Sequence, residues 1–152
     1  MPVVIAQERP DSADAAALIA ELEAHLSPLY PQESRHGYPV DKLLREGVTF
    51  FVARVDGVAA GCAGALLVGS EYAEIKRMYV RPTFRRSGVG KLILEHLSDF
   101  TQAQGVNVLR LETGIHQIEA IRLYQRFGFV RIKPFGPYRE DPLSLCFEKR
   151  LA

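Results

Sequence analysis

Two glycines and a group of basic residues in the middle of the chain could bind an anion. Gly88 and Gly90 stand at the start of a segment, from Val89 to Phe100, in which apolar residues recur every three or four positions, as in an amphipathic helix. The first four N–H groups of a helix lack partners within it and carry a partial positive charge, and glycine lets a ligand approach the backbone closely. Six basic residues and no acidic one lie between positions 76 and 91, namely Lys76, Arg77, Arg81, Arg85, Arg86 and Lys91. The expected chemistry is the binding of a diphosphate by main-chain amides.

Two common nucleotide-binding motifs do not fit this loop. A Walker loop needs a glycine and a hydroxyl where the chain has Arg85 and Leu92. A dinucleotide fingerprint needs a third glycine where the chain has Ile93. The pattern that remains is Arg85-x-x-Gly88-x-Gly90.

This pattern resembles the acetyl-CoA loop of the GCN5-related N-acetyltransferases, the GNAT family, whose signature is Gln or Arg, two residues, Gly, one residue, then Gly or Ala. Segment 117–129, where a helix containing Leu-Tyr ends in Gly-Phe, is similar to a later motif of the family, and segment 73–80 resembles its fourth strand. The resemblance is strongest from Glu74 to Phe129. It implies an N-acetyltransferase that moves the acetyl group of acetyl-CoA to a primary amine of a small molecule or peptide, by direct attack in a ternary complex.

Acetyl-CoA is thus the expected cosubstrate, and the resemblance assigns its contacts residue by residue. The main chain of segment 78–80 would contact the pantetheine arm, and the Val80 amide would polarise the thioester carbonyl. Gln117 stands where many relatives carry an asparagine. The expected cofactor-binding residues are Met78, Tyr79, Val80, Arg85, Arg86, Ser87, Gly88, Val89, Gly90, Lys91 and Gln117. No metal is expected, because the four histidines show no ligand spacing.

Tyr124 and Glu74 are the catalytic residues that the resemblance implies. Tyr124 would protonate the departing CoA thiolate, and the alternative is an aromatic ring that only packs against the sheet. Glu74 would take a proton from the substrate ammonium, directly or through water, which requires a buried carboxylate. The alternative is a solvated strand glutamate paired with Lys76 or Arg77.

The acceptor side of the site is expected in two segments, because the loop between the first two helices and the closing hairpin usually line it in this family. The residues implicated are Tyr30, Glu33, Arg35, His36, Tyr38, Phe135, Tyr138 and Arg139. Their mixed aromatic and charged character fits an amine-bearing small molecule, including one whose carboxylate is held by Arg35 or Arg139, or a peptide amine. The alternative is a proline-rich loop with surface aromatics that bind nothing.

The hydrophobic periods predict an α/β fold with a mixed, mostly antiparallel central sheet and a βαβ acetyl-CoA-binding core, similar to the GNAT arrangement. Strands are expected at 2–7, 48–55, 58–68, 74–80, 106–112, 129–133 and 143–149, with helices from Asp11 or Ser12 to about His25, at 40–45, from Gly88 onward and around Tyr124. Asp56-Gly57 predicts a tight hairpin. The helix beginning near Gly88 should lead by a right-handed crossover to a parallel strand.

The bulk composition favours a single domain over residues 1–152. Hydrophobic residues at 47% and charged residues at 24% indicate neither disorder nor a membrane span, and the net charge of +1 gives no general attraction to nucleic acid. The opening residues lack the features of a signal peptide, so a cytoplasmic location is expected. Cys62 and Cys146 are expected to be buried, reduced thiols.

Two other functions are compatible with parts of the sequence. A CoA-sensing or partner-binding domain would keep the fold without turnover. RNA binding through the arginines would show a strong salt dependence that acetyl-CoA does not affect. No nucleic-acid or membrane partner is expected, and the resemblance permits monomers and homodimers alike.

Overall fold

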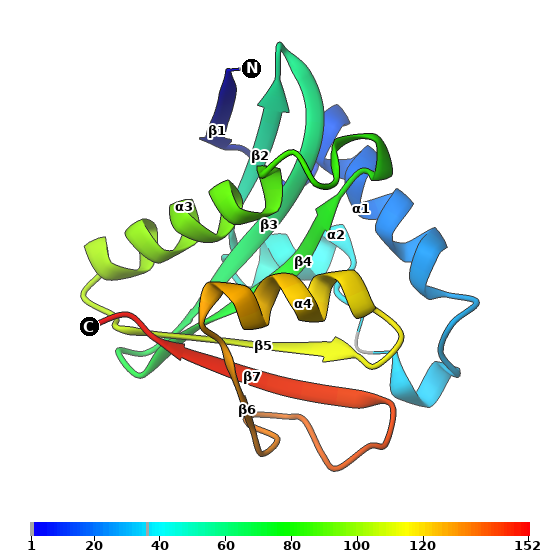
Figure 1. Ribbon diagram of the computed structural model, residues 1–152, viewed down its shortest axis with the longest axis vertical. Helices are drawn as coiled ribbons and strands as arrows, with labels where there is room; N and C mark the ends of the chain where they lie inside the picture. The colour runs from blue at the N-terminus through cyan, green and yellow to red at the C-terminus, as the bar shows by residue number, and fades with distance from the viewer. Residues whose placement is uncertain (1, 36) are drawn as a thin grey trace.

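The centre of the fold is a seven-stranded sheet with the order β1-β2-β3-β4-β5-β7-β6, seen in a computed structural model that describes residues 2–35 and 37–152 (Figure 1). Neighbouring strands are antiparallel except β4 and β5. The strands are β1 (Val3–Gln7), β2 (Thr49–Val55), β3 (Val58–Val68), β4 (Tyr72–Val80), β5 (Val108–Gly114), β6 (Val130–Ile132) and β7 (Ser144–Arg150). The helices are α1 (Ala13–Leu26), α2 (Val40–Arg45), α3 (Val89–Ala103) and α4 (Ile118–Phe127), with 3₁₀ turns at Gln32–Ser34 and Pro82–Phe84. The predicted mixed α/β fold is confirmed.

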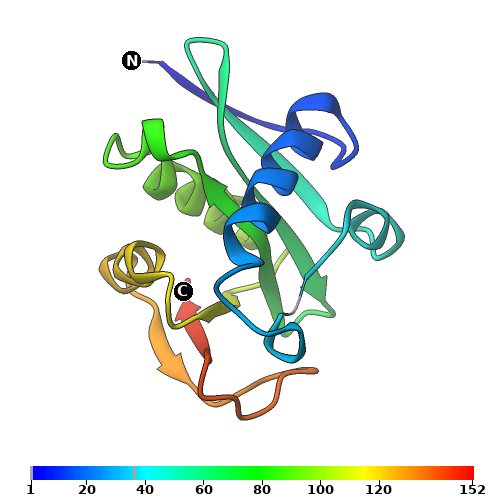
Figure 2. The same cartoon turned by 90° about the vertical axis from the view of Figure 1, so that its right-hand side faces the viewer.

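The helices cover the two faces of the sheet in pairs, α1 and α2 on one face and α3 and α4 on the other (Figure 2). Each pair buries its own apolar core. The core under α3 and α4 includes Ile93, Leu97 and Leu109, and the core under α1 and α2 includes Leu18 and Phe50. The apolar stripe predicted for the helix from Val89 to Phe100 therefore packs on the sheet, as the spacing of its residues predicts.

Local signals account for several boundaries. Ser12 caps α1 by accepting a hydrogen bond from the Ala15 amide at 3.2 Å. Asp56 and Gly57 have left-handed φ angles of 51° and 81°, which is the turn that an Asp-Gly hairpin predicts. Gly128 ends α4 with a φ of 106°, and the Phe129 amide donates to Tyr124 O at 3.0 Å.

The start of β5 was predicted two residues too early. The Val106 amide donates to Thr101 O at 3.1 Å, across a turn in which Gly105 has a φ of 78°. Val106 therefore belongs to the turn that ends α3, so the strand starts only at Val108.

β4 and β5 separate soon after they meet. They are paired in parallel at only two positions, Ala73 with Leu109 and Glu74 with Arg110. Beyond these pairs the two strands diverge, and the ends of both lie near α1 and α4 (Figure 1). The last strand of the chain, β7, lies between β5 and β6 and pairs with both.

The two cysteines and the lengths of the helices test two further expectations. Cys62 and Cys146 are buried free thiols, as predicted, and burial raises the pKa of Cys62 to about 12 and that of Cys146 to about 11. Among the helices of residues 2–35 and 37–152, none combines the length and apolar character needed to span a bilayer.

Candidate active site

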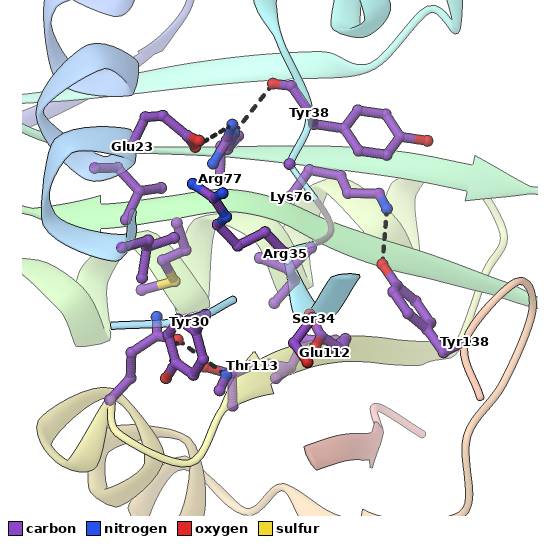
Figure 3. Close-up of a pocket in the computed structure, with 18 of the residues that line it drawn as sticks. Glu23, Tyr30, Ser34, Arg35, Tyr38, Lys76, Arg77, Glu112, Thr113 and Tyr138 are labelled. Atoms are coloured by element: carbon purple, nitrogen blue, oxygen red, sulfur yellow. Dashed lines mark hydrogen bonds and ion pairs between the residues drawn. The ribbon is translucent and has the colours of Figure 1, made fainter. Parts of the chain in front are cut away.

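A cavity lies where β4 and β5 diverge (Figure 3). Its walls come from α1, the loop that follows α1, both diverging strands, α4 and the segment before β7. The lining combines three kinds of side chain. The aliphatic ones are Leu22, Leu26, Ile75, Met78 and Leu111, the aromatic ones are Tyr30, Tyr38, Tyr124 and Tyr138, and the charged ones are Glu23, Arg35, Lys76, Arg77 and Glu112. The cavity thus joins segments that are far apart in the sequence.

The residues expected on the acceptor side separate into two groups. Tyr30, Arg35, Tyr38 and Tyr138 line the cavity. Glu33, Phe135 and Arg139 do not line it in the described structure. Glu33 and Arg139 are exposed, and Phe135 is buried in a small core with Tyr72 and Cys146. His36 lies outside the described residues. The loop after α1 therefore contributes more to the cavity than the closing segment does.

Tyr30 joins this loop to the turn between β5 and α4. Its hydroxyl accepts from the His116 amide at 3.0 Å and donates to Gln117 Oε1 at 3.3 Å. Gln117 Oε1 also accepts from the Gly114 amide at 2.9 Å. Gln117 thus closes this turn with its side chain, and it also lines the cavity.

Gly114 leaves the space that the Tyr30 ring occupies, so Gly114→Ala is expected to displace Tyr30. A Cβ at this position would lie 2.0 Å from Tyr30 Oη. Overpacking of this kind costs about 1–3 kcal/mol, and the acceptor KM should rise with it. Chemical denaturation and steady-state kinetics measure the two effects. In a Tyr30→Ala background the same glycine substitution should cost little, and an equal cost there would contradict this explanation.

A bulge in β4 sets the direction of its last residues. Ala63 of β3 stands opposite two residues of β4, Arg77 and Met78, and Arg77 has a left-handed φ of 53°. Ile75 and Met78 both contact the α3/α4 core although they are three positions apart, whereas in a regular strand such side chains point to opposite faces. The bulge therefore turns the end of β4 relative to its beginning.

The unusual backbone of Arg77 is held in place by its side chain, which is only 8% exposed. Its Nε donates to Tyr38 O at 3.0 Å, and its Nη2 donates to Glu23 Oε2 at 2.9 Å. Such over-determined backbone strain is common at functional sites. Here it fastens the loop before α2 to the bulge.

Glu74 lies behind the cavity wall. It is 3% exposed, and its Oε2 accepts from Lys76 Nζ at 2.8 Å and from the Tyr138 hydroxyl at 2.5 Å. Lys76 Nζ also lies 3.9 Å from the centre of the Tyr38 ring. The alternative prediction, a solvated Glu74 paired with Lys76 or Arg77, is therefore wrong about solvent exposure, but the pairing with Lys76 is confirmed. Lys76 and Tyr138, not Glu74, face the cavity.

Tyr124 combines a packing position with access to the cavity. Its ring belongs to the α3/α4 core and lies 5.7 Å from that of Phe129, yet the residue also lines the cavity. Burial, and to a lesser degree the negative charge of Glu112, raises the pKa of the Tyr124 hydroxyl above its ordinary value. The phenol is therefore protonated at neutral pH and can act as a proton donor.

The N-terminus of α3 has the features expected of an anion site. Gly88 precedes the helix with a left-handed φ of 85°, and in the described chain no side chain caps the first amides, in contrast to α1. A Cβ on Gly88 would meet no atom within 4 Å, so the space beside the helix start is open. Ser87 Oγ donates to Phe84 O, which keeps this side chain turned back into the loop. The open amides can serve a diphosphate.

Gly90 has a second role that the sequence did not indicate. A Cβ here would lie 2.6 Å from Leu123 Cδ2 of α4. The missing side chain therefore lets α3 and α4 approach each other at their contact.

The six basic residues are less available than their spacing in the sequence suggests, because carboxylates from elsewhere in the chain pair with most of them. Four of them form ion pairs with carboxylates, namely Lys76 with Glu74, Arg77 with Glu23, Arg81 with Glu21 and, at 3.8 Å on the surface, Arg86 with Glu119. Arg85 Nε donates to Val80 O at 3.0 Å. Arg86, whose side chain is 89% exposed, and Lys91 remain at the surface. The groups of this loop that remain accessible are therefore Arg86, Lys91 and the amides at the start of α3.

The last residue of β4 turns its amide towards the gap between the strands. The Arg81 amide donates to Ala60 O of β3 at 2.8 Å. Because the N–H and C=O of one peptide plane point in opposite directions, Val80 O points away from β3, and in an extended strand the Val80 N–H points the same way. Val80 therefore presents an N–H on the side from which β5 has diverged. Tyr79 is different, since its side chain lies in the α1/α2 core and donates to Glu21.

All six tyrosines have raised pKa values, which predicts a steep loss of stability in alkali. Burial is the main cause for each of them, Tyr30, Tyr38, Tyr72, Tyr79, Tyr124 and Tyr138. Because the unfolded chain releases these protons near pH 10 while the folded chain retains them, stability should be complete below pH 10 and fall as the pH rises above it. Tyrosinate absorbance should then appear together with the loss of circular dichroism. Gradual ionisation near pH 10 in a folded protein would contradict this prediction.

Sequence reasoning missed several residues of the site because their signals are not local. The bulge at Arg77 carries no glycine, and the contact of Arg77 with Glu23 spans 54 positions. Glu112 and Thr113 line the cavity only because β5 leaves β4. Among the described residues there is no group of three or more histidine, cysteine, aspartate or glutamate side chains placed to hold a metal ion.

Comparison with known proteins agrees with this geometry. Residues 17–129 match the model of the acetyltransferase (GNAT) family. The chain is 44% identical to IAA acetyltransferase of Azospirillum brasilense over 98% of both proteins. A crystal structure described as an acyl-CoA N-acyltransferase of Klebsiella pneumoniae is 34% identical, with a TM-score of 0.84 over 99% of this chain and 98% of that one. The PaiA N-acetyltransferase of Thermoplasma acidophilum, solved with coenzyme A, shares the fold at 20% identity, with a TM-score of 0.76 over 99% of each chain.

These similarities extend over nearly the whole chain and confirm the predicted resemblance, the fold and the class of enzyme. They favour the catalytic interpretation over a CoA sensor. The chain belongs to the GNAT family and is an acetyl-CoA-dependent N-acetyltransferase.

Proposed function

We propose that this enzyme transfers the acetyl group of acetyl-CoA to a primary amine by direct attack in a ternary complex. The observation that carries the proposal is the separation of β4 and β5 after Glu74, which opens the sheet beside the Val80 amide and in front of Tyr124. Two substrates can meet at such an opening, one from each face of the sheet. Holding both in place supplies much of the acceleration in reactions of this kind.

The residues at the start of α3 fit the diphosphate of acetyl-CoA. The uncapped amides from Arg86 to Lys91 would hold it, with Gly88 leaving room for close approach. Arg85 ties this loop to Val80 O and so fixes it relative to β4. The main chain of segment 78–80 would then guide the pantetheine arm towards the cavity, where Met78 and Gln117 line the wall.

Acetyl-CoA supplies the activated carbonyl, and the chain supplies a hydrogen-bond donor and two proton-transfer groups. The Val80 N–H would stabilise negative charge developing on the carbonyl oxygen. The Tyr124 hydroxyl would give its proton to the departing sulfur. Tyr124 lines the cavity, and Val80 ends the strand that forms one side of the same gap.

We assign the proton released by the acceptor ammonium to Glu74 through Tyr138. Glu74 does not line the cavity, but Tyr138 does, and the Tyr138 hydroxyl donates to Glu74 Oε2 at 2.5 Å. As the amine gives its proton to the Tyr138 oxygen, the hydroxyl proton can pass to the carboxylate. Glu74 is thus the base at the end of a short relay.

Thiol release from acetyl-CoA over a panel of amines and peptides tests this function. We expect release that depends on the acceptor, together with a gain of one acetyl mass in the product. Binding of coenzyme A in calorimetry without release for any acceptor would instead support a sensor. The absence of coenzyme A binding by the folded protein would overturn both.

A further inference from the structure

Among the described residues that line the cavity, one cation, Arg35, forms no ion pair with a carboxylate of the protein. Of its three basic side chains, Lys76 is paired with Glu74 and Arg77 with Glu23. Among the described residues no carboxylate forms an ion pair with Arg35. Glu112, the remaining acid in the wall, accepts a hydrogen bond from Ser144 Oγ at 2.6 Å.

One edge of the Arg35 guanidinium is already used and the other is not. Nη1 donates to Ser27 Oγ at the end of α1, at 2.8 Å. Nε is buried and has no hydrogen-bond partner among the described residues. Nε and Nη2 form the edge opposite Nη1, and this is the edge that can bind a carboxylate with two parallel N–H groups. Neither nitrogen of this edge has a hydrogen-bond partner among the described residues. Figure 3 shows this side chain extending from the loop towards α1 and Arg77.

The position of Arg35 is fixed before any ligand binds. Ser27 holds its Nη1, and Arg77 holds the next part of the loop through Tyr38 O. A guanidinium that is held in advance loses little freedom on binding, which favours a specific ligand over casual attraction. Leaving Nε buried without a partner costs free energy that an incoming carboxylate would recover.

The rest of the wall indicates what is attached to that carboxylate. Leu22, Leu26 and Leu111 together with the rings of Tyr30 and Tyr124 form an apolar part of the wall, beside its polar and charged side chains. We propose that the acetyl acceptor is a free amino acid with an apolar side chain, whose carboxylate binds the Nε–Nη2 edge of Arg35 while its amine faces the β4–β5 gap. That the amine is acetylated rests on the proposed function. That the carboxylate binds in this cavity rests on Arg35 alone.

Acetylation of matched pairs, L-phenylalanine against 2-phenylethylamine and L-leucine against 3-methylbutylamine, tests the inference. The wild-type enzyme should prefer the member with a carboxylate, and Arg35→Gln should lower this preference about 10- to 100-fold, as expected for loss of a charged hydrogen-bonded pair. Arg35→Lys should restore only part of it, because an amine cannot form the two-pronged contact. The ratio within one protein sample does not depend on how much of that sample is folded.

Arg45→Gln serves as the control, because Arg45 lies on α2 with a side chain that is 71% exposed and does not line the cavity. An unchanged ratio in Arg35→Gln, an equal change in Arg45→Gln, or preferential acetylation of a peptide N-terminus would overturn the inference.

Calorimetry with coenzyme A-loaded protein separates this inference from the proposed function. L-Phenylalanine should bind the wild type and bind Arg35→Gln at least about 10-fold more weakly. If this difference appears while no amine is ever acetylated, the carboxylate site stands and the proposed function fails. If the enzyme acetylates 2-phenylethylamine as efficiently as L-phenylalanine, the proposed function stands and the carboxylate site fails.

Discussion

Tyr124→Phe is expected to lower kcat by about 100-fold or more while leaving the affinity for coenzyme A unchanged. The variant removes only the hydroxyl of a residue that lines the cavity, and loss of a positioned general acid costs roughly 10²–10⁴-fold. The ring still fills its place in the α3/α4 core next to Phe129, so the fold should persist. Stopped-time thiol assays give kcat, and calorimetry gives the affinity.

Tyr79→Phe is the matched control, because its hydroxyl points to Glu21 on the other face of the sheet. It should retain nearly full turnover. The pH profile adds an independent check. Burial raises the pKa of Tyr124, so the wild-type kcat should show no fall near pH 10 attributable to this group as long as the protein remains folded. Equal losses of kcat in Tyr124→Phe and Tyr79→Phe would contradict the assignment. A fall of the wild-type kcat near pH 10 that is absent in Tyr124→Phe would contradict it too.

Lys76→Met is expected to destabilise the protein by about 3–5 kcal/mol, because it leaves the buried Glu74 carboxylate without its cation. Lys76 and Glu74 have side chains only 6% and 4% exposed, so water cannot replace the lost partner. In a protein of this size the melting temperature should fall by on the order of 10 °C. Denaturant unfolding measures the change in free energy.

The double variant Glu74→Gln/Lys76→Met distinguishes a charge effect from a packing effect. It removes both charges and should be more stable than Lys76→Met alone, which gives a positive coupling energy. If the double variant loses the sum of the two single losses, the ion pair does not explain the stability of this region.

The elements of the fold could be predicted where the information is local. The bounds predicted for α2 and β3 agree with the structure, because a helix period and an Asp-Gly turn define them within a few residues. The glycine that ends α4 was likewise evident. The early start predicted for β5 shows the limit, since Val106 is apolar and strand-like but is bound into the end of α3.

The site could be predicted only as a set of positions. The cofactor loop was evident because its glycines and helix start are adjacent in the sequence. The ion pairs that neutralise Arg77 and Arg81 come from α1, more than 50 positions away, and no pattern in the sequence links them. The contact between Tyr30 and Gly114 is equally remote. Only the structure shows that Arg35, unlike the other two cations of the cavity, has no carboxylate partner within residues 2–35 and 37–152.

The place of β7 has a consequence for how a nascent chain acquires this fold. β6 leaves the ribosome before β7, yet in the sheet β7 separates it from β5. Until β7 pairs with it, β5 has an unpaired edge, which is a site for unwanted strand pairing. β6 can join the sheet only after β7 has paired with β5, so the two strands should add to the sheet together.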